Sequence, residues 1–180
     1  MITAVDTNII LDVLIPGEPF GKSSKKLLDH YLSKGKLIIC EVVFAELAAR
    51  FLSEEELTLF LADTGMGLVH SEEESLCMAG TRWAEYARKS ARNRLSCGKC
   101  SHAFEVTCPK CTAVLTKRLH VLGDFLIGAH ALVHADCILS RDFGIYKAYF
   151  SDLKVIGSIG VSRGGILAKD PAAITKNHEQ

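Results

Sequence analysis

Short β-branched runs alternate with longer stretches of helical spacing along most of the chain. The short apolar runs predict strands at 2–5, 36–40, 67–70, 137–139 and 154–157. Apolar residues between them recur every three or four positions, which predicts helices at 8–14, 21–33, 42–51, 54–62, 72–94, 125–134 and 143–149. This alternation favours an α/β fold in which helices cover both faces of a mainly parallel sheet.

The composition limits the class of protein but does not indicate a binding partner. The 180 residues suit one domain with room for a modest insertion, and a formal charge of zero gives no overall bias toward nucleic acid or membrane. Asp6 and Asp12 interrupt the apolar N-terminal stretch, which therefore resembles neither a signal peptide nor a membrane span. Cys40, Cys77 and Cys137 lie in apolar surroundings, as reduced cysteines do, so we expect a cytoplasmic protein.

The zero net charge conceals two charged stretches of opposite sign. Residues 51–81 hold seven acidic residues and no Lys or Arg. Residues 82–120 hold nine Lys or Arg and two Glu, a net charge of +7. Such runs are often solvated helix faces, but the basic stretch is also suited to contact a phosphate backbone.

Four of the seven cysteines form two Cys-x-x-Cys pairs within fifteen residues: Cys97, Cys100, Cys108 and Cys111. Each pair can bring two sulfurs to one ion, and two pairs complete a tetrahedral site that leaves no position open for water. Two disulfides are disfavoured in a cytosolic chain, and iron–sulfur clusters prefer other spacings. The pattern predicts a structural Zn²⁺ knuckle, inserted at about 95–116.

Acidic residues follow or flank the apolar runs in a way that points to chemistry. Asp6 follows the first predicted strand and Asp142 follows the strand at 137–139, so both belong to the sheet edge where α/β proteins bind ligands. Glu46 lies within an apolar helix face and Asp124 begins a helix. Asp136 precedes its strand, which places it about 13 Å away at the opposite edge.

Taken singly, these acids have ordinary explanations. Asp6 and Asp124 suit helix N-caps, and Glu46 suits an i,i+4 ion pair with Arg50. Brought together, carboxylates repel by roughly 4 kcal/mol per pair at 4 Å and an effective dielectric near 20, which favours bound divalent cations. Oxygen ligands without histidine select Mg²⁺ or Mn²⁺, ions that support hydrolysis of phosphodiesters by activating water.

Four motifs in chain order resemble those of PIN-domain nucleases, most closely the VapC-type toxins of toxin–antitoxin pairs. They are DTN at 6–8, FAEL at 44–47, GDFLIGAHAL at 123–132 and ADCILSRD at 135–142. The resemblance spans residues 1–157 apart from about 95–116, and residues 158–180 form a C-terminal extension. It implies a PIN-like three-layer α/β/α fold and an RNA-cleaving, Mg²⁺- or Mn²⁺-dependent enzyme that forms homodimers and binds an antitoxin.

The resemblance also assigns residue roles. The metal-binding, catalytic quartet falls on Asp6, Glu46, Asp124 and Asp142, and the supporting polar positions fall on Thr7, Asn8 and Ser140. Two departures stand out. Phe143 and Gly144 occupy the place where many relatives carry a further Asp, so a complete second metal site is not expected. Toxins of this type also commonly lack a zinc knuckle.

The knuckle and its surroundings supply candidate contacts to nucleic acid: Lys99, Lys110, Lys117, Arg118 and Arg141. The insertion would either position RNA, dock a partner or simply staple a loop. Three other functions fit the same features. One is RNA processing, since some archaeal rRNA-maturing PIN nucleases carry a zinc ribbon; the others are a non-catalytic zinc-stabilised binding module and structure-specific cleavage of DNA.

Overall fold

The computed structural model describes residues 1–90, 95–96, 102–115 and 122–157. Five strands form one sheet in the order β3-β2-β1-β8-β9, and every pairing in it is parallel. They are β1 (Ile2–Val5), β2 (Lys36–Ile39), β3 (Met66–Leu68), β8 (Cys137–Leu139) and β9 (Val155–Ile156). The predicted α/β fold with a mainly parallel sheet is confirmed.

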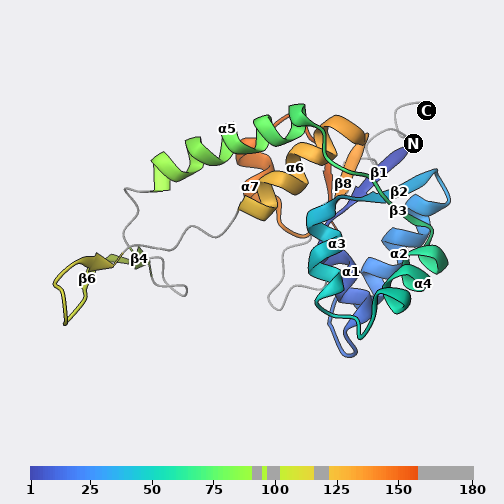
Figure 1. The fold of residues 1–180 in the computed structure, drawn as a ribbon, viewed down its shortest axis with the longest axis horizontal. Coiled ribbons are helices and arrows are strands. Elements are labelled where there is room, and N and C mark those ends of the chain that lie inside the picture. The colour runs from blue at the N-terminus through green and yellow to red at the C-terminus, as the bar shows by residue number, and fades with distance from the viewer. Residues whose placement is uncertain (91–94, 97–101, 116–121, 158–180) are drawn as a thin grey trace, which may run out of the picture.

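Helices lie between each pair of sheet strands that follow one another along the chain (Figure 1). Two helices lie between β1 and β2, two between β2 and β3, two between β3 and β8, and one between β8 and β9. In chain order they are α1 (Thr7–Leu14), α2 (Gly21–Leu32), α3 (Glu41–Ala48), α4 (Glu54–Thr64), α5 (Glu73–Ser90), α6 (Leu122–His134) and α7 (Phe143–Tyr149).

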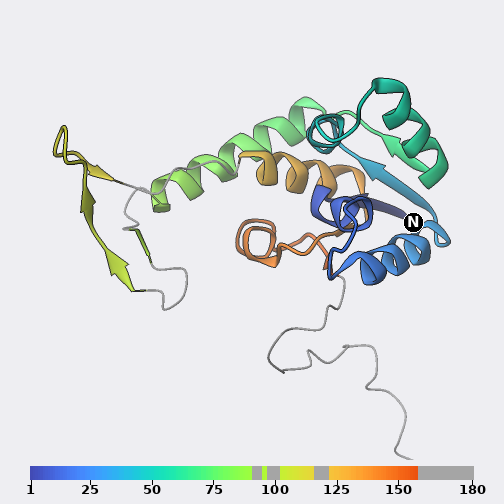
Figure 2. The ribbon, with the colours of Figure 1, turned by 90° about the horizontal axis from the view of Figure 1, so that it is seen from below.

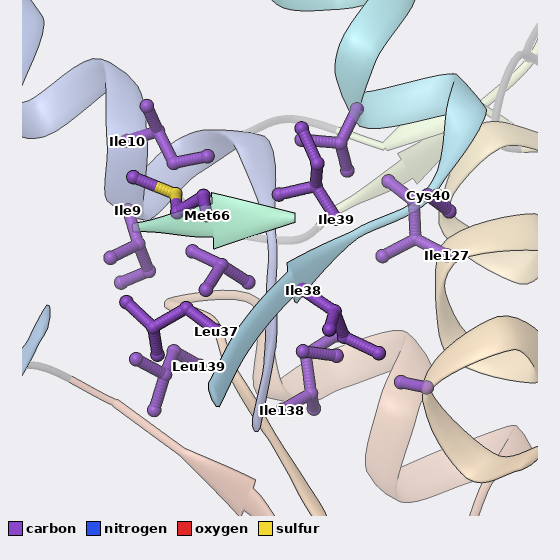
Figure 3. Close-up of a cluster of buried hydrophobic side chains, with 14 of the residues drawn as sticks. Ile9, Ile10, Leu37, Ile38, Ile39, Cys40, Met66, Ile127, Ile138 and Leu139 are labelled. Atoms are coloured by element: carbon purple, nitrogen blue, oxygen red, sulfur yellow. The ribbon is translucent and has the colours of Figure 1, made fainter. Parts of the chain in front are cut away.

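The core lies on both faces of the sheet. Figure 2 shows α5 and α6 on one side of the sheet and α2 on the other. Successive strand side chains point to opposite faces, so Leu37 and Leu139 lie toward α1 while Ile38 and Ile138 lie toward α6 (Figure 3). All four are buried, which explains why these strands are continuous apolar runs rather than alternating ones.

Helix ends depart from the hydrophobic pattern where capping decides them. Ser53 caps α4 by accepting a hydrogen bond from the Glu56 amide at 3.3 Å, and Gly65 ends the helix with a φ of 66°. The helix predicted at 72–94 corresponds to α5, described over Glu73–Ser90, and residues 91–94 lie outside the described residues. The helix α6 already includes Leu122, three residues before the predicted start at 125. Asp124 therefore lies within the first turn of α6 rather than immediately before the helix, where the N-cap explanation placed it.

Four two-residue strands between α5 and α6 were not predicted. They form two antiparallel pairs: β4 (Leu95–Ser96) with β5 (Ala103–Phe104), and β6 (Val106–Thr107) with β7 (Val114–Leu115). Figure 1 shows them beyond the C-terminal end of α5, away from the sheet. Among the described helices, none is both long and apolar enough to cross a membrane.

Candidate active site

Asp6 is the most deeply buried of the predicted acids, with 4% of its surface exposed. It occupies the N-cap position of α1, yet its side chain makes no capping hydrogen bond. Its Oδ2 instead accepts three side-chain hydrogen bonds, from Asn8 Nδ2 at 2.7 Å, Ser140 Oγ at 2.6 Å and Tyr146 OH at 3.2 Å. The N-cap explanation of Asp6 is therefore wrong.

The loop after β8 is fastened to the first turn of α1 by the same polar groups. Asn8 Nδ2 also donates to Ser140 Oγ at 3.2 Å, and Asn8 Oδ1 accepts from the Arg141 amide at 3.0 Å. Ser140 Oγ accepts in addition from the Asp142 amide at 2.9 Å. Asn8 and Ser140, two of the predicted supporting residues, thus lie beside Asp6 and tie two neighbouring strand ends together.

Glu46 reaches the site from α3. Thr7 donates a short hydrogen bond from its hydroxyl to Glu46 Oε2, so the third predicted supporting residue also contacts a predicted acid. Within the described part of the chain, Arg50 forms no ion pair with Glu46, which contradicts the i,i+4 explanation of this acid. Glu46 is solvent-exposed, unlike Asp6.

These side chains surround a pocket of about 540 Å³ at the carboxyl edge of the sheet. Its lining consists of Asp6, Thr7, Asn8, Leu11, Glu46, Ala49, Arg50 and Asp124. Three of the four predicted acids therefore share one pocket. Arg50 is the basic residue in this lining.

The charges of the other three predicted acids affect Asp124. Burial raises its pKa to about 6, with further contributions from the negative charges of Asp6, Asp142 and Glu46. Burial likewise raises the pKa of Asp6, and the hydrogen bonds from Ser140 and Tyr146 oppose this rise. Asp6, Asp142 and Glu46 are thus close enough to Asp124 to disfavour its charge.

Asp136 and Asp142 lie at opposite ends of β8, as the strand geometry predicts. Asp142 follows β8 at the site, and its Oδ1 caps α7 by accepting from the Gly144 amide at 2.9 Å. Asp136 precedes β8, and its Oδ2 accepts from the amide of Ile2 at the start of β1. Asp136 thus lies at the amino ends of these parallel strands and Asp142 at the carboxyl end of β8, as predicted from strand geometry.

The donor chemistry of the pocket fits a hard divalent cation. Its acidic lining offers carboxylate oxygens and neither histidine nor cysteine, the ligand set preferred by Mg²⁺ and Mn²⁺. Across residues 1–90, 95–96, 102–115 and 122–157, no three His, Cys, Asp or Glu side chains form a ready-made cluster around one point. The pocket thus supplies suitable ligands without a preformed three-ligand cage.

Only half of the predicted zinc knuckle can be described. Cys97 and Cys100 lie outside the described residues, as do Lys99, Lys117 and Arg118. Cys108 and Cys111 are free thiols in the turn between β6 and β7. Hydrogen bonds from the backbone amides of Cys111 and Lys110 lower the pKa of the Cys108 thiol. Lys110 itself is exposed.

Arg141, a predicted nucleic-acid contact, is engaged within the protein. Its Nη2 lies 2.8 Å from Oδ1 of Asp12, and its guanidinium lies over the Phe20 ring at 4.6 Å from the centroid. Asp12 is 2% exposed and also accepts from Ser24 Oγ at 2.7 Å. A carboxylate buried to this degree requires such partners, which gives Arg141 a structural role.

Tyr146, Arg50 and Asp12 were not identified from the sequence as parts of the site or its support. Tyr146 is fully buried at a core position of α7. From the hydrophobic pattern it therefore resembles any other core residue, and its hydroxyl contact with Asp6 could not be predicted. Burial, reinforced by the charges of Asp6 and Asp124, raises the pKa of Tyr146 far above its ordinary value, which keeps the hydroxyl a donor. The general preference of buried tyrosines for a polar partner was the available signal.

A family model described as the PIN domain matches residues 3–151. The chain belongs to the PIN domain family. No curated protein matches it significantly.

Solved structures share the fold at low sequence identity. VapBC2 from Rickettsia felis, bound to a DNA fragment from their promoter, is 16% identical with a TM-score of 0.55, covering 87% of this chain and 98% of that one. VapBC-1 from nontypeable Haemophilus influenzae is 19% identical with a TM-score of 0.53, at the same coverages. FitAcB from Neisseria gonorrhoeae is 18% identical with a TM-score of 0.50, covering 87% and 96%. At these identities the likeness establishes the fold.

Proposed function

We propose that this protein is a Mg²⁺- or Mn²⁺-dependent endoribonuclease that hydrolyses RNA phosphodiester bonds in the acidic pocket, in the manner of a VapC-like toxin. The observation that carries the proposal is that Asp6, Glu46 and Asp124, from separate parts of the chain, line one pocket. Membership of the PIN domain family supports the same conclusion. A pure scaffold has no evident reason to gather carboxylates whose charges disfavour one another.

The residues of the pocket have distinct proposed roles. Asp6, Glu46 and Asp124 would hold the cation, with Asp142 contributing negative charge from the end of β8. When bound, the ion would supply an activated water and neutralise charge that develops on the phosphate. Thr7 orients Glu46 through its hydroxyl, and Asn8 and Ser140 orient Asp6.

Arg50 would contact a phosphate of the substrate. It is exposed and lies in the pocket lining among the acids, where a polyanionic strand must approach carboxylates. A guanidinium on the wall offsets that repulsion and can bind a phosphate in bidentate fashion. Its freedom from ion pairing with the described residues leaves it able to do so.

The proposed partners follow from the same comparison. An antitoxin partner is supported by the likeness of the fold to VapBC2, VapBC-1 and FitAcB. A homodimer is supported by Leu52 and Leu59, which are 93% and 63% exposed on or beside α4. Large apolar side chains exposed to this extent favour a contact surface.

We further propose that Cys97, Cys100, Cys108 and Cys111 bind one structural Zn²⁺. The paired Cys-x-x-Cys spacing carries this proposal. It is supported by the turn at Cys108, whose lowered thiol pKa favours the thiolate that a zinc ion requires.

The decisive experiment pairs metal binding with cleavage. Mn²⁺ is titrated by calorimetry into wild type, Asp6→Asn/Asp124→Asn and a control variant, Asp63→Asn, which changes an exposed acid on α4 outside the pocket. All three are then assayed on a mixed pool of structured RNAs. We expect the double variant to lose Mn²⁺ binding and to cleave at least ~100-fold more slowly, while the control matches wild type.

Other outcomes separate the alternatives. Wild type that neither binds Mn²⁺ nor cleaves RNA contradicts the proposal and leaves a non-catalytic binding module. Cleavage of structured DNA with RNA left intact retains the site chemistry but reassigns the substrate. Selective cutting of an rRNA precursor at one position would favour RNA processing over a toxin.

A further inference from the structure

We propose that Tyr146 is a positioning residue of the active site: its hydroxyl fixes the Asp6 carboxylate so that Oδ1, rather than Oδ2, is presented as the cation ligand. This inference rests on the proposed function, because it assigns a role within the same metal site. It adds a residue that neither the motifs nor the family resemblance identify.

The first argument is the uneven use of the two oxygens of Asp6. Tyr146 OH, Ser140 Oγ and Asn8 Nδ2 all donate to Oδ2, at 3.2, 2.6 and 2.7 Å. An ionised carboxylate offers about two lone-pair sites per oxygen, so three donors occupy Oδ2 fully. The three side-chain donors thus all use Oδ2, which leaves Oδ1 as the oxygen that no side chain of the described residues occupies and that faces a cation.

The second argument is that Tyr146 cannot easily move. It is fully buried in α7, and its ring lies against Phe150 with a centroid separation of 6.2 Å. Gly128 of α6 faces both rings, and a Cβ there would lie 3.0 Å from Tyr146 Cε1 and 2.9 Å from Phe150 Cε2. The ring thus fits against a helix surface where a side chain would crowd it, and its hydroxyl is held at a fixed point.

The third argument concerns the direction of the three donors. Asn8 approaches from the first turn of α1 and Ser140 from the residue after β8, both at the carboxyl edge of the sheet. Tyr146 approaches from α7, the helix that Asp142 caps through the Gly144 amide. Tyr146 therefore links the position of Asp6 to α7, the helix whose N-terminus Asp142 caps. Such outer partners orient ligands and sustain metal affinity.

The test removes one hydroxyl at a time from the same aromatic cluster. Tyr146→Phe deletes the donor to Asp6 and keeps the ring. Tyr149→Phe is the matched control, because Tyr149 lies in the same helix and packs on Phe125 and Tyr86, while its hydroxyl makes no hydrogen bond to the described residues. Calorimetry gives the Mn²⁺ Kd of each variant, and RNA cleavage is followed across Mn²⁺ concentrations.

We expect Tyr146→Phe to bind Mn²⁺ roughly ten-fold more weakly than wild type, since loss of an outer-shell partner costs about 10- to 100-fold. Its cleavage rate should fall at low Mn²⁺ and recover toward the wild-type rate at saturation, whereas Tyr149→Phe should match wild type throughout. A merely structural role would not change the Mn²⁺ dependence of the rate.

Each contrary result has one meaning. An unchanged Mn²⁺ Kd in Tyr146→Phe overturns this inference and leaves the proposed function intact. A rate lowered equally at all Mn²⁺ concentrations assigns Tyr146 to packing and also overturns it. If wild type itself fails to bind Mn²⁺, the proposed function fails and this inference fails with it.

Discussion

Asp6 and Asp124 are held in surroundings that disfavour their own charge. Burial raises the pKa of both groups, and in Asp124 the charges of Asp6, Asp142 and Glu46 add to the effect. Carboxyl groups that are merely structural are usually stabilised in the ionised form by caps or ion pairs. Carboxyl groups whose pKa is raised by neighbouring charges are typical of functional sites, where catalysis requires an arrangement that lowers folding stability.

This trade-off predicts that Asp124→Asn makes the metal-free protein more stable. The amide keeps the shape of the side chain and removes the repulsion, so we expect a gain of about 1 kcal/mol at pH 7.5, because water screens much of the repulsion at this half-buried group. For a chain of this size that is a rise in Tm of roughly 3 °C. Thermal unfolding in EDTA measures it, with Asp63→Asn as the control.

The pH dependence of this gain has a defined sign. The folded pKa of Asp124 is about 6, above its ordinary value of 3.8, so the folded protein binds more protons between these values. The stability contributed by the protonated group is present below pH 3.8 and is lost as the pH rises through about 6. The Tm difference between variant and wild type should therefore grow across this range. A variant no more stable than wild type at pH 7.5 would contradict the repulsion argued here.

The positions of the candidate acids and of Thr7, Asn8 and Ser140 beside them were predictable from sequence, whereas the contact of Tyr146 with Asp6 was not. Asp6 and Asp142 follow strands whose apolar runs are unambiguous, and a strand end fixes the position of the next residue in space. Tyr146 has the spacing of a core residue, and in packing terms it is one. Only the three-dimensional approach of α7 to β1 reveals that its hydroxyl meets Asp6.

At the scale of elements, the loop after β8 owes its position to α1 and α2 as much as to its own sequence. Arg141 in this loop pairs with Asp12 of α1 and stacks on Phe20, just before α2. Ser24 of α2 donates to the same Asp12 carboxylate. The contacts hold the loop that carries Ser140 and Asp142 against the helices that follow β1.

We therefore predict that Arg141→Ala destabilises the protein by about 2 kcal/mol, because it leaves the buried Asp12 carboxylate without its cation. The loss should be smaller when Asp12→Asn is added, since the amide needs no counter-charge. Urea unfolding of wild type, both single variants and the double variant forms the required cycle.

A different result would favour the sequence-based prediction that Arg141 contacts nucleic acid. In that case Arg141→Ala would leave the unfolding midpoint unchanged and reduce the salt dependence of RNA binding by about 0.7 in slope, the value for one contact on a single strand. The two measurements thus separate support of the loop from contact with substrate.

The strands of the main sheet and the helices beside them were predicted well, whereas the two-residue strands were not. The strand at 137–139 and the helix at 143–149 agree with the structure at both ends. The strands β4–β7 have two residues each, too few for any alternation to be visible.

At the scale of the whole molecule, the segment proposed to form the zinc knuckle lies between two helices of the PIN domain. The helices α5 and α6 flank it in sequence and pack against each other, and α6 contacts β1 and β8 in turn. Aromatic contacts between Tyr86 of α5 and Phe125 of α6, with centroids 5.6 Å apart, join the two helices near the insertion. The contacts between α5 and α6 thus join the parts of the PIN domain on either side of this segment.

This arrangement predicts how the protein responds to loss of zinc. We expect the purified chain to carry one Zn²⁺, the Cys108→Ser variant to lose it, and the Cys77→Ser variant to retain it, because Cys77 is an exposed thiol on α5 outside the cysteine cluster. Zinc content measured by metal release tests this directly. Bound zinc typically contributes on the order of 10 kcal/mol to local folding, so Cys108→Ser should become sensitive to proteolysis within 95–116.

The main thermal transition should remain in Cys108→Ser, since the packing of α5 on α6 does not depend on the metal. Wild type without zinc, or equal loss of zinc from both variants, would contradict the four-cysteine site. RNA cleavage by Cys108→Ser then distinguishes the two roles considered for the insertion. An unchanged rate assigns it to stapling the loop between two helices, whereas a raised KM with kcat retained assigns it to holding RNA, because a contact made equally in ground and transition states affects binding alone.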